Sequence, residues 1–183
     1  MNWSTIEYVI EGPKKDLSEI KNAIPNTEKI LLSKVLENLE IKVENECLVN
    51  GRIINWFDKN ETIRIFTREA WGRSDFAECL KEKYPFLKIY YQSLDFNIGL
   101  FETNDINHKY FKAVYYADFA NYDKEDLDIG MLFSSESSLF KWLSEKLDRK
   151  ITSLSEIDFD SYNDNQHLLE VKSIRYFNVD LIK

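Results

Sequence analysis

Two arginines in a strand-like stretch are the first candidates for binding chemistry. If residues 61–68 form a strand, alternation points Arg64 and Arg68 the same way, together with Thr62 and Phe66. A small anion or an acidic peptide is the ligand that such a surface would suit.

Trp71 and Arg73 extend this cationic group. Arg73 stands close to the start of an expected helix, whose free N–H groups attract anions. Ordinary surface ion pairs with Glu61 and Glu69 are the favoured explanation for the arginines. A pocket near Trp71 and Arg73 would instead favour a small-ligand receptor or an enzyme.

His108 is the other candidate, because it lies in a polar loop near Glu102 and Asp105. A pocket around it would favour general-base or metal chemistry, and an exposed loop histidine is the alternative. Neither His108 nor His167 has a His, Cys or carboxylate at the helical spacing of a ligand pair. We therefore expect no metal site.

The two cysteines are poor nucleophiles by position. Cys79 lies on the apolar side of an expected helix, where a free cysteine packs as a small hydrophobic residue. Cys47 follows Glu44 and Glu46, whose charges act to raise the pKa of its thiol. The acidic loop around Asp158 lacks the glycine and the bidentate glutamate of a calcium loop.

Glycine-rich and catalytic motifs are missing. With five glycines, the sequence contains no dinucleotide fingerprint, phosphate loop or nucleophile elbow. We expect no cofactor and no catalytic residue, and this favours a protein that is not an enzyme.

The amino-acid composition limits the classes of partner that we expect for this protein. A net charge of -8 argues against nucleic acid, unless a local basic patch meets it. No run approaches the roughly 18 apolar residues of a membrane span, and the first residues lack the pattern of a secretory signal. These features predict a cytoplasmic protein with no membrane contact, and they leave its oligomeric state open.

Aromatic residues are abundant, with ten tyrosines and four tryptophans. Pairs such as Tyr90-Tyr91 and Tyr115-Tyr116 put one ring on each face of an expected strand. Either a further helix, such as the one expected over Ser135–Leu147, covers the outward rings, or they form a binding surface. Burial in a core is the favoured interpretation.

The order of elements predicts an α+β fold. The expected strands and helices up to residue 91 give a β-α-β-β-α-β unit with one extra helix, capped by Asn26 or Thr27. Ser74 is the expected cap of the second core helix. The segments are strand 5–10, helices 13–24 and 26–39, strands 51–58 and 61–68, helix 74–84 and strand 87–91.

Later segments predict an extension of the same antiparallel sheet. Residues 97–102 and 109–118 are expected to be strands, and 121–128 an acidic turn. A helix follows Ser135, and 167–179 is expected to be a closing strand. We predict a single domain over 1–183, with a ferredoxin-like core over 1–118 and a C-terminal extension over 119–183.

The segment Thr67-Arg68-Glu69-Ala70-Trp71, followed by Lys83-Tyr84-Pro85 and Leu87–Tyr91, resembles the YubB ferredoxin-like domain family of bacteria and mobile elements. The turn Gly12-Pro13-Lys14 is similar to that family's N-terminal element. The resemblance covers residues 1–118 and implies a fold, since the family has no established activity.

Two segments depart from the family pattern, namely Gly72-Arg73-Ser74 and Asp95–Gly99, where prolines and a Gly-Met-Gly-like turn are usual. The leading hypothesis is a non-enzymatic bacterial interaction module whose acidic, aromatic surface binds another protein. One form of it is an immunity-type or mobile-element protein that blocks a basic partner.

Overall fold

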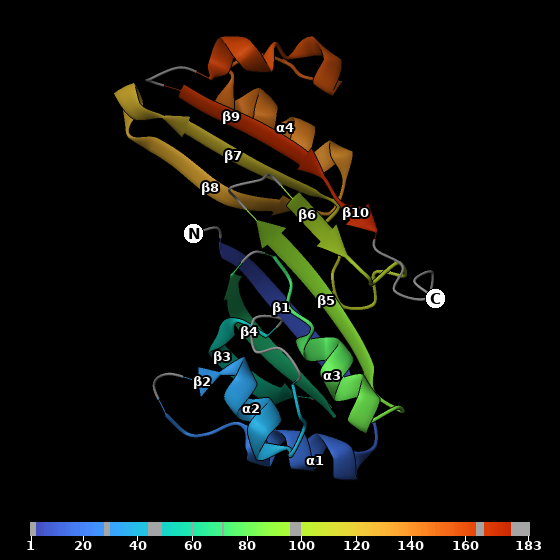
Figure 1. Ribbon diagram of the computed structural model, residues 1–183. Helices are drawn as coiled ribbons and strands as arrows, with labels where there is room; N and C mark the ends of the chain where they lie inside the picture. Colours follow the sequence, from blue (N-terminus) through green and yellow to red (C-terminus); the bar gives the residue numbers. More distant parts are fainter. Residues whose placement is uncertain are drawn as a thin grey trace. The chain divides into compact units, whose positions relative to one another are not determined.

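Antiparallel pairing dominates this α+β chain. The computed structural model describes residues 3–27, 30–43, 49–59, 61–70, 72–95, 100–163 and 167–176, and within them it shows four α-helices and two antiparallel sheets (Figure 1). Contacts divide the chain into two compact units, Met1–Phe111 with Tyr176–Lys183, and Lys112–Arg175. The expected single domain thus contains two separate cores, and its expected internal boundary at Asp118 lies inside a strand of the second unit.

The larger sheet has seven strands in the order β10-β6-β5-β1-β4-β3-β2. With the inserted β2 and α2 set aside, the chain order up to β5 is the predicted β-α-β-β-α-β. The strands are β1 (Trp3–Glu11), β2 (Ile30–Leu31), β3 (Gly51–Lys59), β4 (Thr62–Ala70), β5 (Lys88–Asp95), β6 (Leu100–Thr103) and β10 (Arg175–Tyr176), and the helices are α1 (Lys14–Ala23), α2 (Leu32–Asn38) and α3 (Phe76–Lys83).

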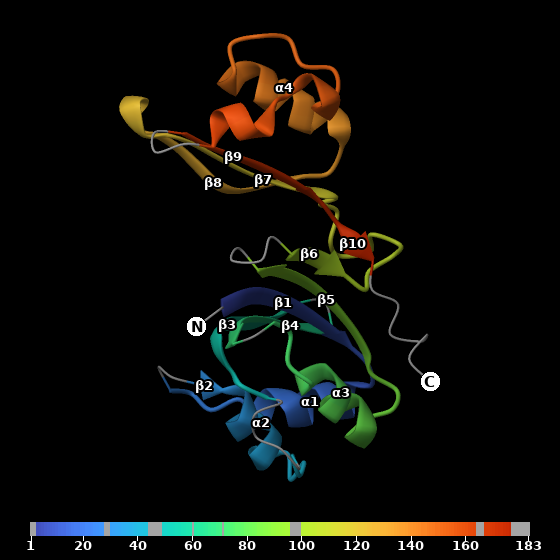
Figure 2. The ribbon, with the colours of Figure 1, turned by 45° about the horizontal axis from the view of Figure 1, so that its top comes forward.

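All three helices of the first unit lie on one face of this sheet (Figures 1 and 2). Their apolar sides pack against inward side chains such as Tyr8, Ile65 and Tyr91 to form one core. Leu17 and Ile20 of α1 and Leu80 of α3 are buried, as their helical spacing predicted. The helices thus leave the opposite face of the sheet without a helical layer of the first unit.

Two helices begin differently from the prediction. Ser74 does not cap α3, because the N-cap position falls on Asp75 and the Ser74 side-chain oxygen accepts no hydrogen bond from the described residues; its backbone N–H donates to the Glu69 carboxylate. The predicted caps Asn26 and Thr27 are also wrong, since α2 starts only after the short strand β2, with Leu31 at its N-cap. Both errors concern helix starts that contacts outside the helix determine.

The second unit is a three-stranded sheet in the order β8-β7-β9, with α4 on one face (Figure 2). Ser135 caps α4 as predicted, accepting a hydrogen bond from the N–H of Ser138. Leu139, Trp142 and Leu143 pack on β7, and Lys146 bridges the strand β8 to the helix. The elements are β7 (Tyr115–Asn121), η2 (Tyr122–Lys124), β8 (Asp126–Phe133), α4 (Glu136–Lys146), η3 (Leu154–Glu156), η4 (Phe159–Tyr162) and β9 (His167–Ser173).

The predicted extension of the first sheet is correct for β6 and wrong for the next strand. Residues 109–114 are not a strand, and β7 starts at Tyr115 in the separate sheet of the second unit. The acidic segment expected to be a turn ends at Glu125, and Asp126 begins β8.

We expect Phe76→Ala to destabilise the first unit by about 3–5 kcal/mol, because the ring is fully buried and its loss leaves a cavity. Phe86→Ala is the matched control, since that ring is 77% exposed and its removal should change stability by less than about 0.5 kcal/mol. Urea denaturation of both variants measures the difference. Equal losses in the two would contradict the assignment of the core.

Candidate functional site: the sheet face opposite the helices

Strand register assigns side chains to the face of the larger sheet that carries no helix. Thr5 of β1 lies opposite Leu94 of β5 and Arg68 of β4, and Arg68 in turn lies opposite Arg52 of β3. Alternation then gives the set for β1, β4 and β5, and in β3 the register shift between Ile53 and Asn55 brings Asn55, Phe57 and Lys59 to the same face as Arg52. It comprises Trp3, Thr5, Glu7, Val9 and Glu11; Arg52, Asn55, Phe57 and Lys59; Thr62, Arg64, Phe66 and Arg68; and Lys88, Tyr90, Gln92 and Leu94. We call this set, with Lys109 and Tyr110 of the loop that lies against it, the cationic aromatic face.

Positive charge outweighs negative charge on this face. Its described residues carry two carboxylates, Glu7 and Glu11, against six cations. The cations are Arg52, Lys59, Arg64, Arg68, Lys88 and Lys109. Because the whole sequence has a net charge of -8, this face is a local basic patch on an acidic chain.

Both carboxylates of the face are paired. Glu7 accepts a hydrogen bond of 2.7 Å from Arg64. Burial raises the pKa of Glu7, and the Arg64 guanidinium offsets only part of that rise. Burial also acts to raise the pKa of Glu11, but hydrogen bonds from Lys109 and Tyr110 outweigh it and lower the pKa. The negative charge of the face is therefore neutralised within the face itself.

Aromatic rings and cations stack on one another across the face. The guanidinium carbon of Arg68 lies 5.6 Å from the ring centre of Trp3, and that of Arg64 lies 5.7 Å from the ring of Tyr110. Phe57 and Phe66 have ring centres 5.9 Å apart. Such distances are within the range of cation–π attraction and aromatic packing.

A buried aspartate builds the loop that carries Tyr110. The Asp105 side chain, 1% exposed, accepts hydrogen bonds from the backbone N–H groups of Lys109, Tyr110 and Phe111, at 3.0, 2.7 and 3.0 Å. The Asn104 side chain ties the start of the loop to the backbone of β5. The loop thereby sets the Tyr110 ring 5.1 Å from that of Tyr90.

Phe57, Lys59, Thr62, Arg64 and Tyr110 line a cavity of about 400 Å³ on this face. Two of its walls are aromatic rings and two are cations, and none of these five lining residues is acidic. Its volume falls in the range of small-ligand sites. The cavity combines flat apolar surface with positive charge.

Arg52 and Arg68 place two like charges next to each other on the face. The two arginines lie directly opposite one another on adjacent strands, and both are exposed. Like charges in this arrangement destabilise a sheet. No carboxylate of the described residues forms an ion pair with Arg52, Arg68, Lys59 or Lys88. An anion between the two arginines would relieve the repulsion.

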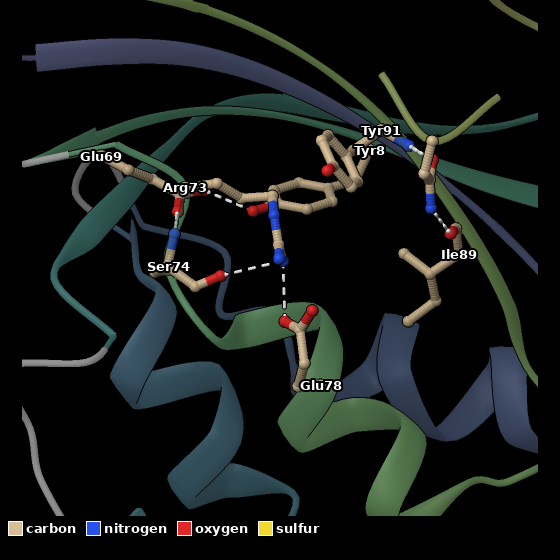
Figure 3. A network of polar contacts seen from close by, with 8 residues as sticks. Tyr8, Glu69, Arg73, Ser74, Glu78, Ile89 and Tyr91 are labelled. Carbon is tan, nitrogen blue, oxygen red and sulfur yellow. Dashed lines mark hydrogen bonds and ion pairs between the residues drawn. The ribbon is translucent and has the colours of Figure 1, made fainter. Parts of the chain in front are cut away.

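A second polar cluster lies inside the helical core (Figure 3). The carboxylate of Glu69 is fully buried and accepts hydrogen bonds from the Tyr8 hydroxyl (2.9 Å), the Thr67 hydroxyl (2.6 Å) and the Ser74 N–H (2.6 Å). The close approach to β3 depends on Gly51, because a Cβ there would lie 2.6 Å from the Glu69 side chain. The three donors offset the cost of burying the carboxylate.

Arg73 belongs to this core cluster and not to the face of Arg64 and Arg68. Its side chain, 14% exposed, forms an ion pair of 2.7 Å with Glu78, and its guanidinium carbon lies 4.6 Å from the ring centre of Tyr91 (Figure 3). Burial raises the pKa of Tyr91 to about 12, against the opposing effect of Arg73. The predicted group of three arginines is therefore split across the sheet, and Arg73 has a structural role.

The remaining candidates are not brought into a common pocket. His108 has φ of 51° and its Nδ1–H donates to the Phe111 carbonyl at 3.0 Å, so it helps to shape the loop. Trp71 and Cys47 lie outside the described residues. Burial raises the pKa of the Cys79 thiol, which agrees with a packing role. Five cavities of 340 to 840 Å³ lie on the described residues, and neither Arg73 nor His108 lines any of these five.

Sequence reasoning missed most of the face. It grouped Arg64 with Arg68 correctly and expected one ring of the Tyr90-Tyr91 pair to face outward, without saying which, but it did not find Arg52, Phe57 or Lys109. Extending the register of the hairpin turn without a bulge would pair Ile53 with Arg68, so the alignment of Arg52 with Arg68 depends on the register shift between Ile53 and Asn55, which the sequence pattern does not reveal.

Within the described residues, two kinds of feature are absent: a cluster of metal ligands and a helix suited to a membrane. No three His, Cys, Asp or Glu side chains gather there in a way that could hold a metal ion. Among the same residues, no helix has both the length and the apolar character that crossing a bilayer requires.

Comparison of the chain with protein-family models, with curated proteins and with solved structures found no match in any of the three.

We expect Arg73→Ala to destabilise the first unit by about 1–3 kcal/mol, since it removes the partner of Glu78 from a largely buried site. Arg68→Ala, on the exposed face, should change stability by less than about 0.5 kcal/mol. Chemical denaturation of the two single variants provides the comparison. A larger loss for Arg68→Ala would refute the division into a structural and a surface arginine.

Proposed function

We propose that this chain is a non-enzymatic binding module that recognises an anionic partner through the cationic aromatic face. The observation that carries the proposal is the surplus of cations on one sheet face of a chain whose net charge is -8. A positive patch on an acidic molecule costs stability through like-charge repulsion, as between Arg52 and Arg68. A bound anion would offset this repulsion between the two arginines.

Electrostatics also supports selectivity. An acidic remainder repels anions, so a negatively charged partner is directed to the one face that attracts it. The exposed cations Lys59 and Lys88 act at the encounter, whereas Arg64, paired with Glu7, is already oriented for contact. The face is thus suited to fast, salt-sensitive association.

The fold supports a further proposal about ancestry. The four central strands have the order β5-β1-β4-β3, with α1 and α3 as connections on one face, which is the arrangement expected of a ferredoxin-like unit. We propose on this basis, and on the sequence resemblance, that the first unit is related to the YubB ferredoxin-like domains.

A second candidate function is favoured by the charge of the second unit. Between Lys112 and Arg175 the sequence has 13 acidic residues and 8 basic ones. Tyr122, Leu127 and Leu132 are exposed there. An immunity-type module that blocks a basic protein would use this surface. Capture of a basic partner that is lost on neutralising the exposed Asp123, Glu125 and Asp158 would favour this candidate.

We expect the double variant Arg52→Glu/Arg68→Glu to weaken binding of heparin, used as a generic polyanion, by on the order of tenfold or more. The variant turns two attractive charges into repulsive ones at the centre of the proposed contact. Heparin affinity measured at several salt concentrations tests this, and the salt dependence should become shallower in the variant.

Lys15→Glu/Lys81→Glu is the matched control, because it changes the net charge equally but alters the exposed helical side of the first unit. It should keep heparin affinity within about twofold. Equal weakening by both double variants would mean that net charge alone governs binding, and the proposed site would be wrong.

A further inference from the structure

The rings of the cationic aromatic face distinguish between kinds of anionic partner. An acidic peptide needs cations and hydrogen-bond donors, and its carboxylates gain nothing from a flat ring. The face nevertheless presents five rings: that of Phe57 is 39% exposed, and those of Trp3, Phe66, Tyr90 and Tyr110 are partly exposed. Rings on a sheet face, next to cations, are the combination that binds unpaired bases and their phosphates.

The cavity on the face fits one repeat of such a ligand. Phe57, 39% exposed, and Tyr110 supply apolar ring surface, while Lys59 and Arg64 supply charge within the same 400 Å³. A nucleotide has both a flat base and a phosphate, so it can use the rings and the cations at once. The Thr62 hydroxyl already donates to the Lys59 carbonyl, which leaves the cations as the donors for an anion.

More cations continue from the cavity along the sheet. Arg68 lies on β4 four positions from Arg64, and Arg52 lies on β3 five positions from Phe57, on the same face because the register shift between Ile53 and Asn55 adds one residue to β3. Phe66 lies between the two positions, with its ring against that of Phe57. A chain with a phosphate at each repeat could therefore contact several cations in succession.

We infer that the anionic partner of the cationic aromatic face is single-stranded nucleic acid, with a base held at Phe57 and Tyr110 and the phosphates at Arg64, Arg68 and Arg52. The inference rests on the proposed function and names its partner. The net charge of -8 argues against nucleic acid as a partner, and the cationic aromatic face supplies the local basic patch that such a partner needs. A duplex does not fit this role, because its bases are paired and stacked and it offers only grooves and phosphates to the protein.

The test is fluorescence anisotropy with labelled RNA and DNA single strands of about 12 nucleotides, a length within the usual site sizes of single-strand binding folds. A duplex of the same length, polyglutamate and heparin are the competing anions. We expect the single strands to bind at least about tenfold more tightly than the duplex or polyglutamate at equal salt. The RNA and DNA arms show which sugar is preferred.

Phe57→Leu and Tyr110→Leu remove the flat ring while they keep apolar volume. Each should weaken single-strand binding by about 5- to 100-fold and leave heparin binding within about twofold. Phe86→Leu, at an exposed phenylalanine in the turn before β5, is the matched control and should change neither. Far-ultraviolet circular dichroism of each variant verifies the fold, and Phe57 is exposed enough for its variant to stay folded.

Failure of the inference is separable from failure of the proposed function. If duplex or polyglutamate binds as tightly as the single strands, or if ring removal has no effect, the partner is not single-stranded nucleic acid. Heparin binding that still depends on Arg52 and Arg68 would then leave the proposed function intact. Loss of that dependence would overturn both.

Discussion

The pairing of β1 with its two neighbours is the constraint on which both surfaces of the larger sheet depend. β1 is aligned with β4 over nine residue pairs and with β5 over eight. Because side chains alternate along a strand, this register sends Tyr8 into the helical core and Glu7 onto the opposite face. A slip of β1 by one residue would exchange its two sides, placing Glu7 and Glu11 among the helices and Tyr8 on the opposite face. The register of β1 therefore determines both which side chains form the binding face and which enter the core.

The buried Glu69 makes that alignment demanding. A carboxylate without donors is costly in an apolar core, and its donors come from β1, β4 and the segment before α3. All three donor groups must be in place at the same time, so the cluster links the central strands to the start of α3. We regard it as a determinant of the fold of the first unit, and Arg73 with Glu78 extends it to the helix.

How far the sequence predicted this molecule depends on the range of the interaction concerned. Local signals worked: the apolar spacing of α1, α3 and α4 and the cap at Ser135 are contained within a few residues. Ser74 failed as a cap because the N-cap of α3 lies one residue later, at Asp75, and the Ser74 backbone N–H is bound to Glu69 of β4. Strand β8 was missed because Asp126 and Asp128 look like turn residues until Lys146 of α4 pairs with both. The site shows the same division, since Arg64 and Arg68 follow from alternation within one strand, while Arg52 reaches the face only through the register shift between Ile53 and Asn55 of β3.

The loop held by Asp105 has a consequence for the thermodynamics of recognition. Three backbone N–H groups converge on one carboxylate, so the Tyr110 side chain is attached to a backbone that is already fixed before any ligand arrives. Ordering a mobile side chain or loop on association costs free energy, which reduces the net free energy of binding. Preorganisation of this segment removes part of that entropic penalty, so a small, flat patch of protein can hold a flexible ligand that itself loses much freedom on binding.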